Sequence, residues 1–307
     1  MAASSKAASA GAQLLLPEVL ARIDNLELLS RTVVEGFLNG LHRSIYLGLS
    51  VDFAEHRPYM PGDDIRLIDW RLYGRTDRHY IKLFEAETNA NLVVLLDVSR
   101  SMSYGSHPVT KLDYARYLAA CLLYFSRQQR DRVGLITFDN DIVDYIPPSA
   151  KNLDLCLHKL QQAEAGQPGG LRKPLLKATE SLRRRGILVL ISDFYEDPDA
   201  VVDAVRLLQS PGHDVMVFHI LDPDELEFPF EVSTDFQDME TREQLPVVPG
   251  KLRERYRNLV SDHTAELQDR FTAGQVDYAV LDTSKPLDQA LFRLLLHRQS
   301  RKRSRIR

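Results

Sequence analysis

The sequence has little cysteine and no long apolar segment. Its two cysteines, Cys121 and Cys156, fall in amphipathic helical patterns without CxxC spacing, so they indicate core thiols and no zinc site. Its apolar runs, such as LVVLL at 92–96, are far shorter than the roughly 20 residues that cross a bilayer. The N-terminus has one basic residue, Lys6, and three consecutive leucines, too little for a secretory signal. We therefore expect a cytoplasmic protein without a membrane span.

An excess of charge of one sign is also missing. The net charge of −4 gives no whole-protein argument for binding nucleic acid or an anionic membrane. Basic residues gather only at Arg183 to Arg185 and in the tail from Arg298 to Arg307, and no aromatic residue that could stack on a base lies among them. A nucleic-acid-binding protein that uses these helix ends and this tail is therefore kept as an alternative.

Short catalytic motifs are absent as well. The sequence contains no GxSxG, GxxxxGK[ST], HExxH or GxGxxG pattern, and none of its histidines stands in a recognisable triad context. An enzyme that forms an aspartyl-phosphate needs a second carboxylate two residues after its nucleophile, and Ser99 stands at that position after Asp97. We expect no catalysis, and a hydrolase of unrecognised type is kept as a second alternative.

Apolar strands alternate with amphipathic helices after residue 90. This order predicts an α/β fold with a doubly wound, mostly parallel sheet covered on both faces, from about 88 to 300. Helices are expected at about 111–129, 152–164, 172–185, 198–209, 251–273 and 286–300. The six expected strands are LVVLLDVS, RVGLITFD, IVDYIPP, ILVLISDF, DVMVFHIL and VDYAVLD, and a short hairpin is expected within 224–249.

The chain before this alternation has a different character. One or two amphipathic helices are expected between 17 and 42, followed by a charged, extended stretch from 46 to 87 that has no helical period and contains the strand HYIKLF. The expected domains are an N-terminal extension, 1–87, and an α/β domain, 88–307.

Acidic residues follow three of the predicted strands. They are Asp97, Asp139 with Asp141, and Asp193. Ligands of open α/β sheets bind outside the carboxyl ends of the strands, near the point where strand order reverses, and converging oxygen donors suit Mg²⁺. In the segment DVSRS a turn can aim Asp97, Ser99 and Ser101 at one point. The structural alternative is that Asp97 caps this turn and the serines satisfy backbone donors.

The Asp-x-Ser-x-Ser spacing at a strand end resembles the metal-ion-dependent adhesion site of von Willebrand factor type A domains. The resemblance implies a von Willebrand A-like fold and a Mg²⁺ ion whose open coordination position accepts an acidic side chain of a partner. The implied ligands are Asp97, Ser99, Ser101 and Asp193. Leu171, in GQPGGLRKPLL, falls where that family has a threonine, so the resemblance implies that metal binding is weakened or lost.

A second resemblance lies upstream, in RPYMPGDDIRLIDWRLYGRTDRHYIKLFEAE at 57–87. This segment resembles the signature of the proteins catalogued as domain of unknown function 58, and the resemblance covers roughly residues 40 to 300. It implies a non-catalytic protein-binding module that acts with a MoxR-type AAA+ ATPase in the assembly or maturation of a client protein.

Charges of alternating sign and the only tryptophan mark this signature segment. Such density favours a network of charge-assisted hydrogen bonds that docks the segment on the α/β domain, and a surface for a partner is the alternative. The residues expected to dock or to bind a partner are Arg57, Tyr59, Asp63, Asp64, Arg66, Asp69, Trp70 and Arg75.

Overall fold

The computed structural model describes residues 16–43, 56–60, 70–82, 90–232, 234–239, 242, 244–247, 249–294 and 296. The chain divides into two compact units. The first unit joins Met1–Phe37 with Asn89–Arg307, and the second unit is Leu38–Thr88.

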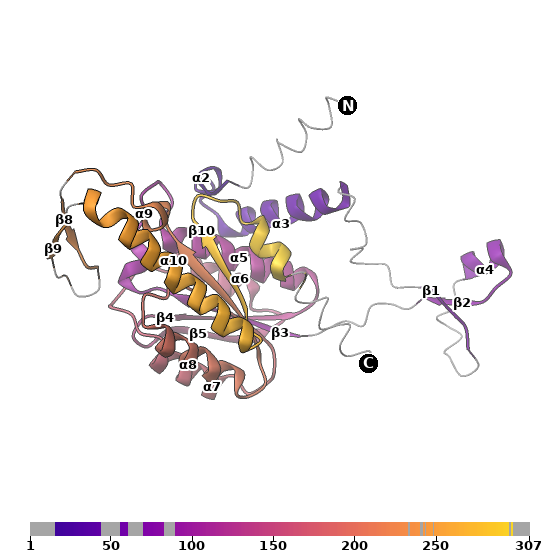
Figure 1. The fold of residues 1–307 in the computed structure, drawn as a ribbon. Helices are drawn as coiled ribbons and strands as arrows, with labels where there is room; N and C mark the ends of the chain where they lie inside the picture. The colour runs from indigo at the N-terminus through magenta and orange to yellow at the C-terminus, as the bar shows by residue number, and fades with distance from the viewer. Residues whose placement is uncertain are drawn as a thin grey trace, which may run out of the picture. The chain divides into compact units, whose positions relative to one another are not determined.

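A six-stranded sheet forms the centre of the first unit (Figure 1). Its strands lie in the order β10-β7-β6-β3-β4-β5, and all neighbours pair in parallel except β4 and β5, which are antiparallel. The predicted doubly wound, mostly parallel α/β fold is confirmed. The strands are β3 (Asn91–Asp97), β4 (Arg132–Phe138), β5 (Ile142–Ser149), β6 (Ile187–Ser192), β7 (Asp214–Leu221) and β10 (Asp277–Asp282).

The strands differ in pattern according to their place in the sheet. The central strands β3 and β6 are buried along their whole length, which matches their uninterrupted aliphatic sequences, because helices cover both faces. The edge strand β5 is partly exposed and contains Pro147 and Pro148, which cannot donate the backbone hydrogen bonds that an interior strand needs.

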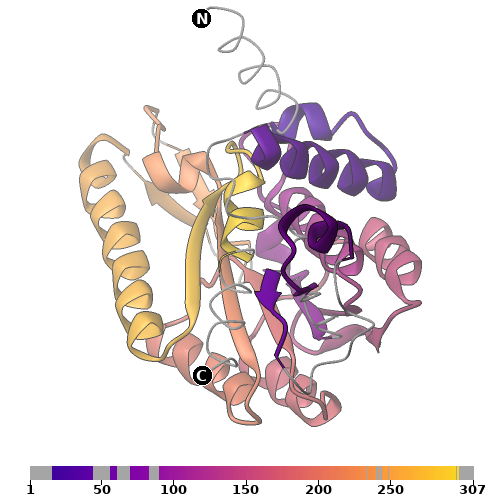
Figure 2. The ribbon, with the colours of Figure 1, turned by 90° about the vertical axis from the view of Figure 1, so that its right-hand side faces the viewer.

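Two sets of helices cover the sheet (Figure 2). One face carries α5 (Lys111–Gln128) and α6 (Leu153–Gln162). The other face carries α7 (Arg172–Ser181), α8 (Pro198–Gln209) and α10 (Pro249–Ala273), whose apolar side chains share one buried cluster with those of the sheet. The positions of these helices agree closely with those predicted from the apolar spacing.

The first helices of the chain belong to the α/β unit. After the short α2 (Pro17–Leu20), helix α3 (Leu26–Arg43) buries a stripe at three- and four-residue spacings: Leu26, Leu29, Ser30, Val33, Val34 and Phe37. The ring of Phe37 contacts that of Phe125 in α5, with ring centroids 6.5 Å apart. The domain boundary expected at residue 87 therefore differs from the observed division, in which the chain up to Phe37 packs with the α/β fold.

The second unit contains an antiparallel pair, β1 (His56–Pro58) and β2 (Tyr80–Lys82), and a helix, α4 (Trp70–Thr76). The strand predicted around HYIKLF is confirmed in β2. The prediction of an extended stretch without helix was wrong for α4. This helix has only seven residues and no apolar repeat, and Tyr73 from it stacks on His79 with ring centroids 4.4 Å apart, a contact that periodicity does not reveal.

The segment 224–249 contains the predicted hairpin, formed by β8 (Thr234–Gln237) and β9 (Gln244–Val247). It also begins with a helix that was not predicted, α9 (Pro223–Glu227). A capping box between Asp222 and Glu225 fixes this single turn, and so short a helix shows no period in the sequence.

The buried histidine of β7 makes stability depend on pH. Burial is the main cause that lowers the pKa of His219 from 6.5 to about 3, and its Nδ1 lies 2.6 Å from the Tyr278 hydroxyl. Below pH 6.5 the unfolded chain takes up a proton that the folded chain does not, so acidification toward pH 3 removes stability by up to about 1.4 kcal/mol per pH unit.

We therefore expect His219→Leu to flatten the acid limb of the stability curve. Urea unfolding of the wild type and the variant gives the free energy of unfolding at pH 6.5 and at about pH 4.5. The loss of this free energy between the two pH values is compared, so a difference in absolute stability between the two proteins does not matter. An equal difference in the variant and the wild type would contradict the assignment to His219.

Candidate functional site

The strand order reverses between β3 and β6, because the chain continues from β3 to β4 and β5 on one side and from β6 to β7 and β10 on the other. Asp97 ends β3 and Asp193 directly follows β6, so both lie at this reversal, where open α/β sheets bind ligands. The sequence-based placement of these two carboxylates at one edge of the sheet is confirmed.

Asp97 organises the turn that leaves β3. Its Oδ1 accepts a hydrogen bond of 2.8 Å from the Ser99 backbone N–H, and its Oδ2 accepts one of 2.6 Å from the Ser192 hydroxyl. The Ser99 and Ser101 hydroxyls lie 3.1 Å apart, so the turn does bring the three predicted side chains together. Ser101 belongs to the short 3-10 helix η2 (Arg100–Ser103).

The environment of Asp97 disfavours its charge. Burial, and then the nearby charge of Asp193, raise the pKa of Asp97 from 3.8 to about 7, although the hydrogen bonds from Ser192 and Ser99 act in the opposite direction. The raised pKa means that Asp97 loses its charge more easily than an exposed aspartate does. Both of its carboxylate oxygens already accept hydrogen bonds from the protein.

Asp193 is bound by a lysine that the sequence analysis did not single out. The Lys111 ammonium donates to Asp193 Oδ2 at 2.7 Å and to Glu225 Oε1 at 2.8 Å, and the lysine is fully buried. Burial by itself would lower the pKa of Lys111, but the charges of Asp193 and Glu225 outweigh it and hold that pKa above its ordinary value.

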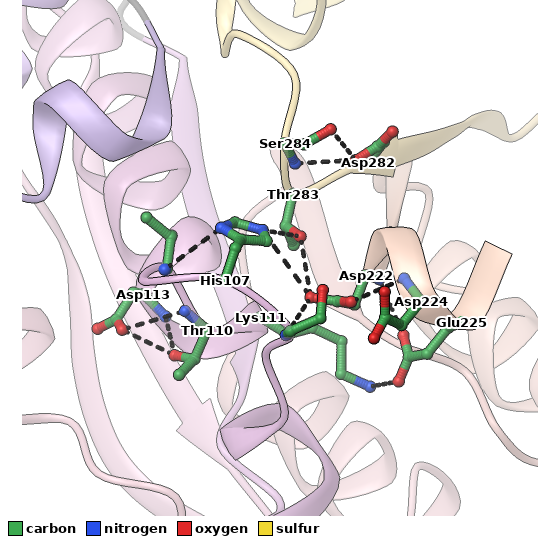
Figure 3. A network of polar contacts seen from close by, with 12 residues as sticks. His107, Thr110, Lys111, Asp113, Asp222, Asp224, Glu225, Asp282, Thr283 and Ser284 are labelled. Carbon is green, nitrogen blue, oxygen red and sulfur yellow. Dashed lines mark hydrogen bonds and ion pairs between the residues drawn. The ribbon is translucent and has the colours of Figure 1, made fainter. Parts of the chain in front are cut away.

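Figure 3 shows Lys111 reaching Glu225, together with the cap of the helix that carries the lysine. Lys111 is the first residue of α5, and a capping box between Thr110 and Asp113 fixes this helix start. Glu225 is held by its own capping box in α9. Two short-range devices thus position two residues that are far apart in sequence.

Aromatic rings enclose the ammonium group. Lys111 Nζ lies 4.7 Å from the ring centroid of Tyr195 and 5.9 Å from that of Tyr104, within the range of cation–π contacts. Tyr195 is 54% exposed as a whole residue, and burial of its hydroxyl, with the charges of Glu225 and Asp193, raises the pKa of that hydroxyl.

The Gly-rich loop between α6 and α7 closes over the β3 turn. The Gly166 backbone N–H donates to the Val98 carbonyl at 2.8 Å, and the Arg100 N–H donates to the Gln167 carbonyl at 3.1 Å. A Cβ at Gly169 would lie 2.5 Å from Ser99 Cβ, closer than such atoms approach, so the contact requires glycine. Asp97, Ser99, Ser101 and Asp193 are each at most 8% exposed.

Leu171 ends the same loop and has an apolar role. It is 3% exposed, belongs to the buried cluster of α7, α8 and the sheet, and its backbone N–H donates to the Glu196 carboxylate at 2.7 Å. Its place in this cluster explains why a leucine stands there, and the side chain offers no oxygen to a cation.

These residues do not fit a Mg²⁺ ion held in the predicted way. Two unit charges 4 Å apart interact by about 4 kcal/mol at an effective dielectric constant of 20, and a divalent ion doubles that energy. A divalent ion on Asp193 would therefore be strongly repelled by Lys111, and all four predicted ligands are buried. Within the described ranges, no three His, Cys, Asp or Glu side chains are arranged to hold a metal.

The remaining strand-end acids are used separately. Asp139 Oδ1 accepts from the Asp141 N–H, and the Asp141 carboxylate pairs with Lys173 and Lys177 at the surface. Neither acid is bonded directly to Asp97, Ser99, Ser101 or Asp193, but Asp139 Oδ2 accepts a hydrogen bond of 3.4 Å from the Gln167 N–H of the loop that covers the β3 turn. The prediction that acids follow three strands is confirmed, and only two of these strand ends build the cluster.

The sequence contained an indication that Lys111 has a special role. It opens a helix, where the helix dipole disfavours a cation, and lysine is rarely buried unless it is paired. Glu225 and Ser192 had no comparable signal, because their roles depend on contacts with Lys111 and Asp97 across the fold.

The signature segment can be placed only in part. Tyr59 and Arg75 lie in the second unit, where the Tyr59 N–H donates to the His79 carbonyl at 2.9 Å and Arg75 is exposed in the last turn of α4. Arg57 is in β1 and Trp70 begins α4. Asp63, Asp64, Arg66 and Asp69 lie outside the described residues, and docking of this segment stays a prediction.

A second polar network next to Lys111 resembles a catalytic arrangement at first sight (Figure 3). His107 Nε2 lies 2.8 Å from the Thr283 hydroxyl and 3.8 Å from Asp222 Oδ2. The Val109 N–H donates to His107 Nδ1, which assigns the ring proton to Nε2, so this nitrogen donates to Thr283 and cannot take its proton. The network ties the loop before α5 to the ends of β7 and β10.

The strand order and the pairing directions define a doubly wound, mostly parallel α/β domain with a polar cluster at the reversal of strand order. Residues 55–266 match the family described as "Protein of unknown function DUF58", and the chain belongs to this family.

Uncharacterized proteins of Mycobacterium tuberculosis and Mycobacterium bovis are each 26% identical over 260 residues, which cover 82% of this chain and 80% of those proteins. An aerotolerance-related membrane protein from Bacteroides fragilis has 20% identity and a TM-score of 0.48, over 68% of this chain and 99% of that one. The SpRpn10 VWA domain has 11% identity and a TM-score of 0.39, over 66% and 93% of the two chains.

In the part of this chain that the structure describes, no helix combines the length and apolar character that a membrane crossing needs.

Proposed function

We propose that this chain is a non-catalytic protein-binding module whose contact surface lies over the carboxyl ends of β3 and β6. This carboxyl-edge surface consists of Arg100, Tyr104, Tyr195 and the β8–β9 hairpin. The partner is the one that the sequence resemblance implies, a MoxR-type AAA+ ATPase, and the pair acts on a client protein during its assembly or maturation. The proposal keeps the expected cytoplasmic location, which cell fractionation tests.

The observation that carries the proposal is the position of Tyr195. More than half of its surface is exposed, while its ring rests on an ammonium group that two carboxylates hold in place. An exposed aromatic side chain on such a fixed base is ordered before a partner arrives, so binding loses less side-chain entropy. Tyrosine and arginine are also the residue types that dominate binding energy at protein interfaces.

The neighbouring groups extend this surface. Arg100 Nη1 lies 3.5 Å from the Met239 carbonyl, in the turn of the β8–β9 hairpin, so the hairpin stands beside the β3 turn. The buried side chains of Asp97 and the serines near it are hydrogen-bonded within this part of the fold. They fix the backbone on which the exposed side chains of the surface stand. The module then recognises its partner through side chains of the loops and requires no open metal position.

Tyr195→Ala tests this surface. We expect the variant to fold and to recover about tenfold less ATPase than the wild type, because a loss of about 1.4 kcal/mol of binding free energy corresponds to a factor of ten. The measurement is co-purification of a MoxR-type ATPase with the tagged full-length chain from its native cell.

The matched control is Tyr145→Ala, at another exposed tyrosine, 41% exposed on the edge strand β5. It should recover as much ATPase as the wild type. Equal recovery with both variants would reject the carboxyl-edge surface, and no recovery with the wild type would reject the ATPase as partner.

A further inference from the structure

The cluster at the carboxyl edge contains a cation of its own. Lys111 is the only described cation that an ion pair joins to Asp193, and it also binds Glu225, which comes from a third loop. The side chains of Lys111 and Asp193 are 0% and 4% exposed. A buried lysine of this kind is rare without paired carboxylates, and here both partners are present.

Lys111 also connects the loops that a metal ion would connect. It stands at the end of the loop after β3, Asp193 follows β6, and Glu225 lies in α9 after β7. A divalent ion in an Asp-x-Ser-x-Ser site links loops through shared oxygen ligands. Here a single ammonium group joins three loops through two direct hydrogen bonds.

The rest of the cluster is complete without a further ligand. Asp97 has both oxygens bonded, the Ser99 and Ser101 hydroxyls lie within hydrogen-bond distance of each other, and Gly169 packs against Ser99. A Mg²⁺ ion would have to share Asp193 with the ammonium group of Lys111.

We propose that Lys111 is the resident cation of this cluster, that it replaces the divalent ion of Asp-x-Ser-x-Ser sites, and that the carboxyl edge is held together without metal. This inference does not depend on the identity of the partner. It predicts that the wild type holds no metal here and that removal of Lys111 exposes a latent divalent-cation site at Asp97 and Asp193.

Mn²⁺ binding to the full-length chain, followed by electron paramagnetic resonance of the free ion, tests the proposal. The wild type should bind no Mn²⁺ at this site up to about 1 mM, whereas Lys111→Met should bind it with a dissociation constant of about 0.1 mM or less, about tenfold below that limit. Adding Asp97→Ala to Lys111→Met should remove the gained binding. Lys177→Met, which breaks an exposed lysine–carboxylate pair on Asp141, is the matched control and should behave as the wild type.

Two results would overturn the proposal. One is Mn²⁺ binding by the wild type that Asp97→Ala abolishes. The other is a folded Lys111→Met variant that gains no binding, because the lysine would then not be what excludes the ion.

A thermal-unfolding measurement that does not use Lys111→Met keeps the proposal testable if that variant does not fold. An ion that binds the folded state raises its stability with the logarithm of the ion concentration. Because the proposal says that the wild type binds no ion here, its melting temperature should be the same in about 5 mM Mg²⁺ and in EDTA. A higher melting temperature in Mg²⁺ that disappears in Asp97→Ala would count against a resident lysine cation.

Discussion

Replacing Lys111 with methionine is expected to lower the free energy of unfolding by about 3–5 kcal/mol, because removal of one partner of a buried ion pair leaves the other charge uncompensated. Two such charges remain here, since the side chains of Asp193 and Glu225 are 4% and 12% exposed. Methionine keeps the length and the apolar stem of lysine, so the loss reports mainly on the ammonium group. The urea midpoint at pH 7 measures it.

The control for this variant is again Lys177→Met. Lys177 binds Asp141 at 2.7 Å, the same distance at which Lys111 binds Asp193, but the pair is exposed and screened by water. Its removal should barely move the urea midpoint. Adding Asp193→Asn and Glu225→Gln to Lys111→Met should recover part of the lost stability, and a similar midpoint for both single lysine variants would show that the buried pair does not hold the edge together.

Replacing Phe194 with alanine is expected to cost about 3–5 kcal/mol, the usual range for removing a large buried aromatic side chain. Phe194 is 1% exposed and lies in the apolar cluster below the carboxyl edge. It follows Asp193 directly and has a left-handed φ of 46°, a conformation that is unfavourable for a bulky residue and that burial of the ring offsets. Its backbone N–H donates to the Ser192 hydroxyl at 3.2 Å, so the same residue fixes the β6 end.

Urea unfolding of Phe194→Ala, Phe194→Leu and Tyr195→Ala separates the ring of Phe194 from its neighbourhood. We expect an intermediate loss for Phe194→Leu, because leucine fills part of the volume, and a smaller loss for Tyr195→Ala, because that residue is half-exposed. A larger loss for Tyr195→Ala than for Phe194→Ala would mean that the cover over Lys111, and not the core below it, stabilises this edge.

Much of the fold could be predicted because its signals are local. The run LVVLL marks a strand buried on both faces, and the spacing of Val201, Val205 and Leu208 marks the buried face of α8. Helices α4 and α9 escaped prediction, since seven and five residues are too few for a period, and contacts elsewhere in the fold or capping hydrogen bonds stabilise them.

The candidate site was predicted in position but not in chemistry. The residues Asp97, Ser99 and Ser101 do converge at the reversal of strand order, as the spacing and the strand end indicated. The metal-bridged contact implied by the von Willebrand resemblance does not fit, because Asp193 is bound by Lys111 and the Gly-rich loop closes the turn.

By itself, the sequence determined the alternation of strands and helices and the edge of the sheet at which the polar residues gather. Both follow from periodicity and from the rule that parallel strands end on the same side. The tertiary structure alone decided which groups bond there. Lys111 meets Asp193 across 82 residues and Glu225 across 114, and such partners are selected by the packing of whole elements, which leaves no mark in local spacing.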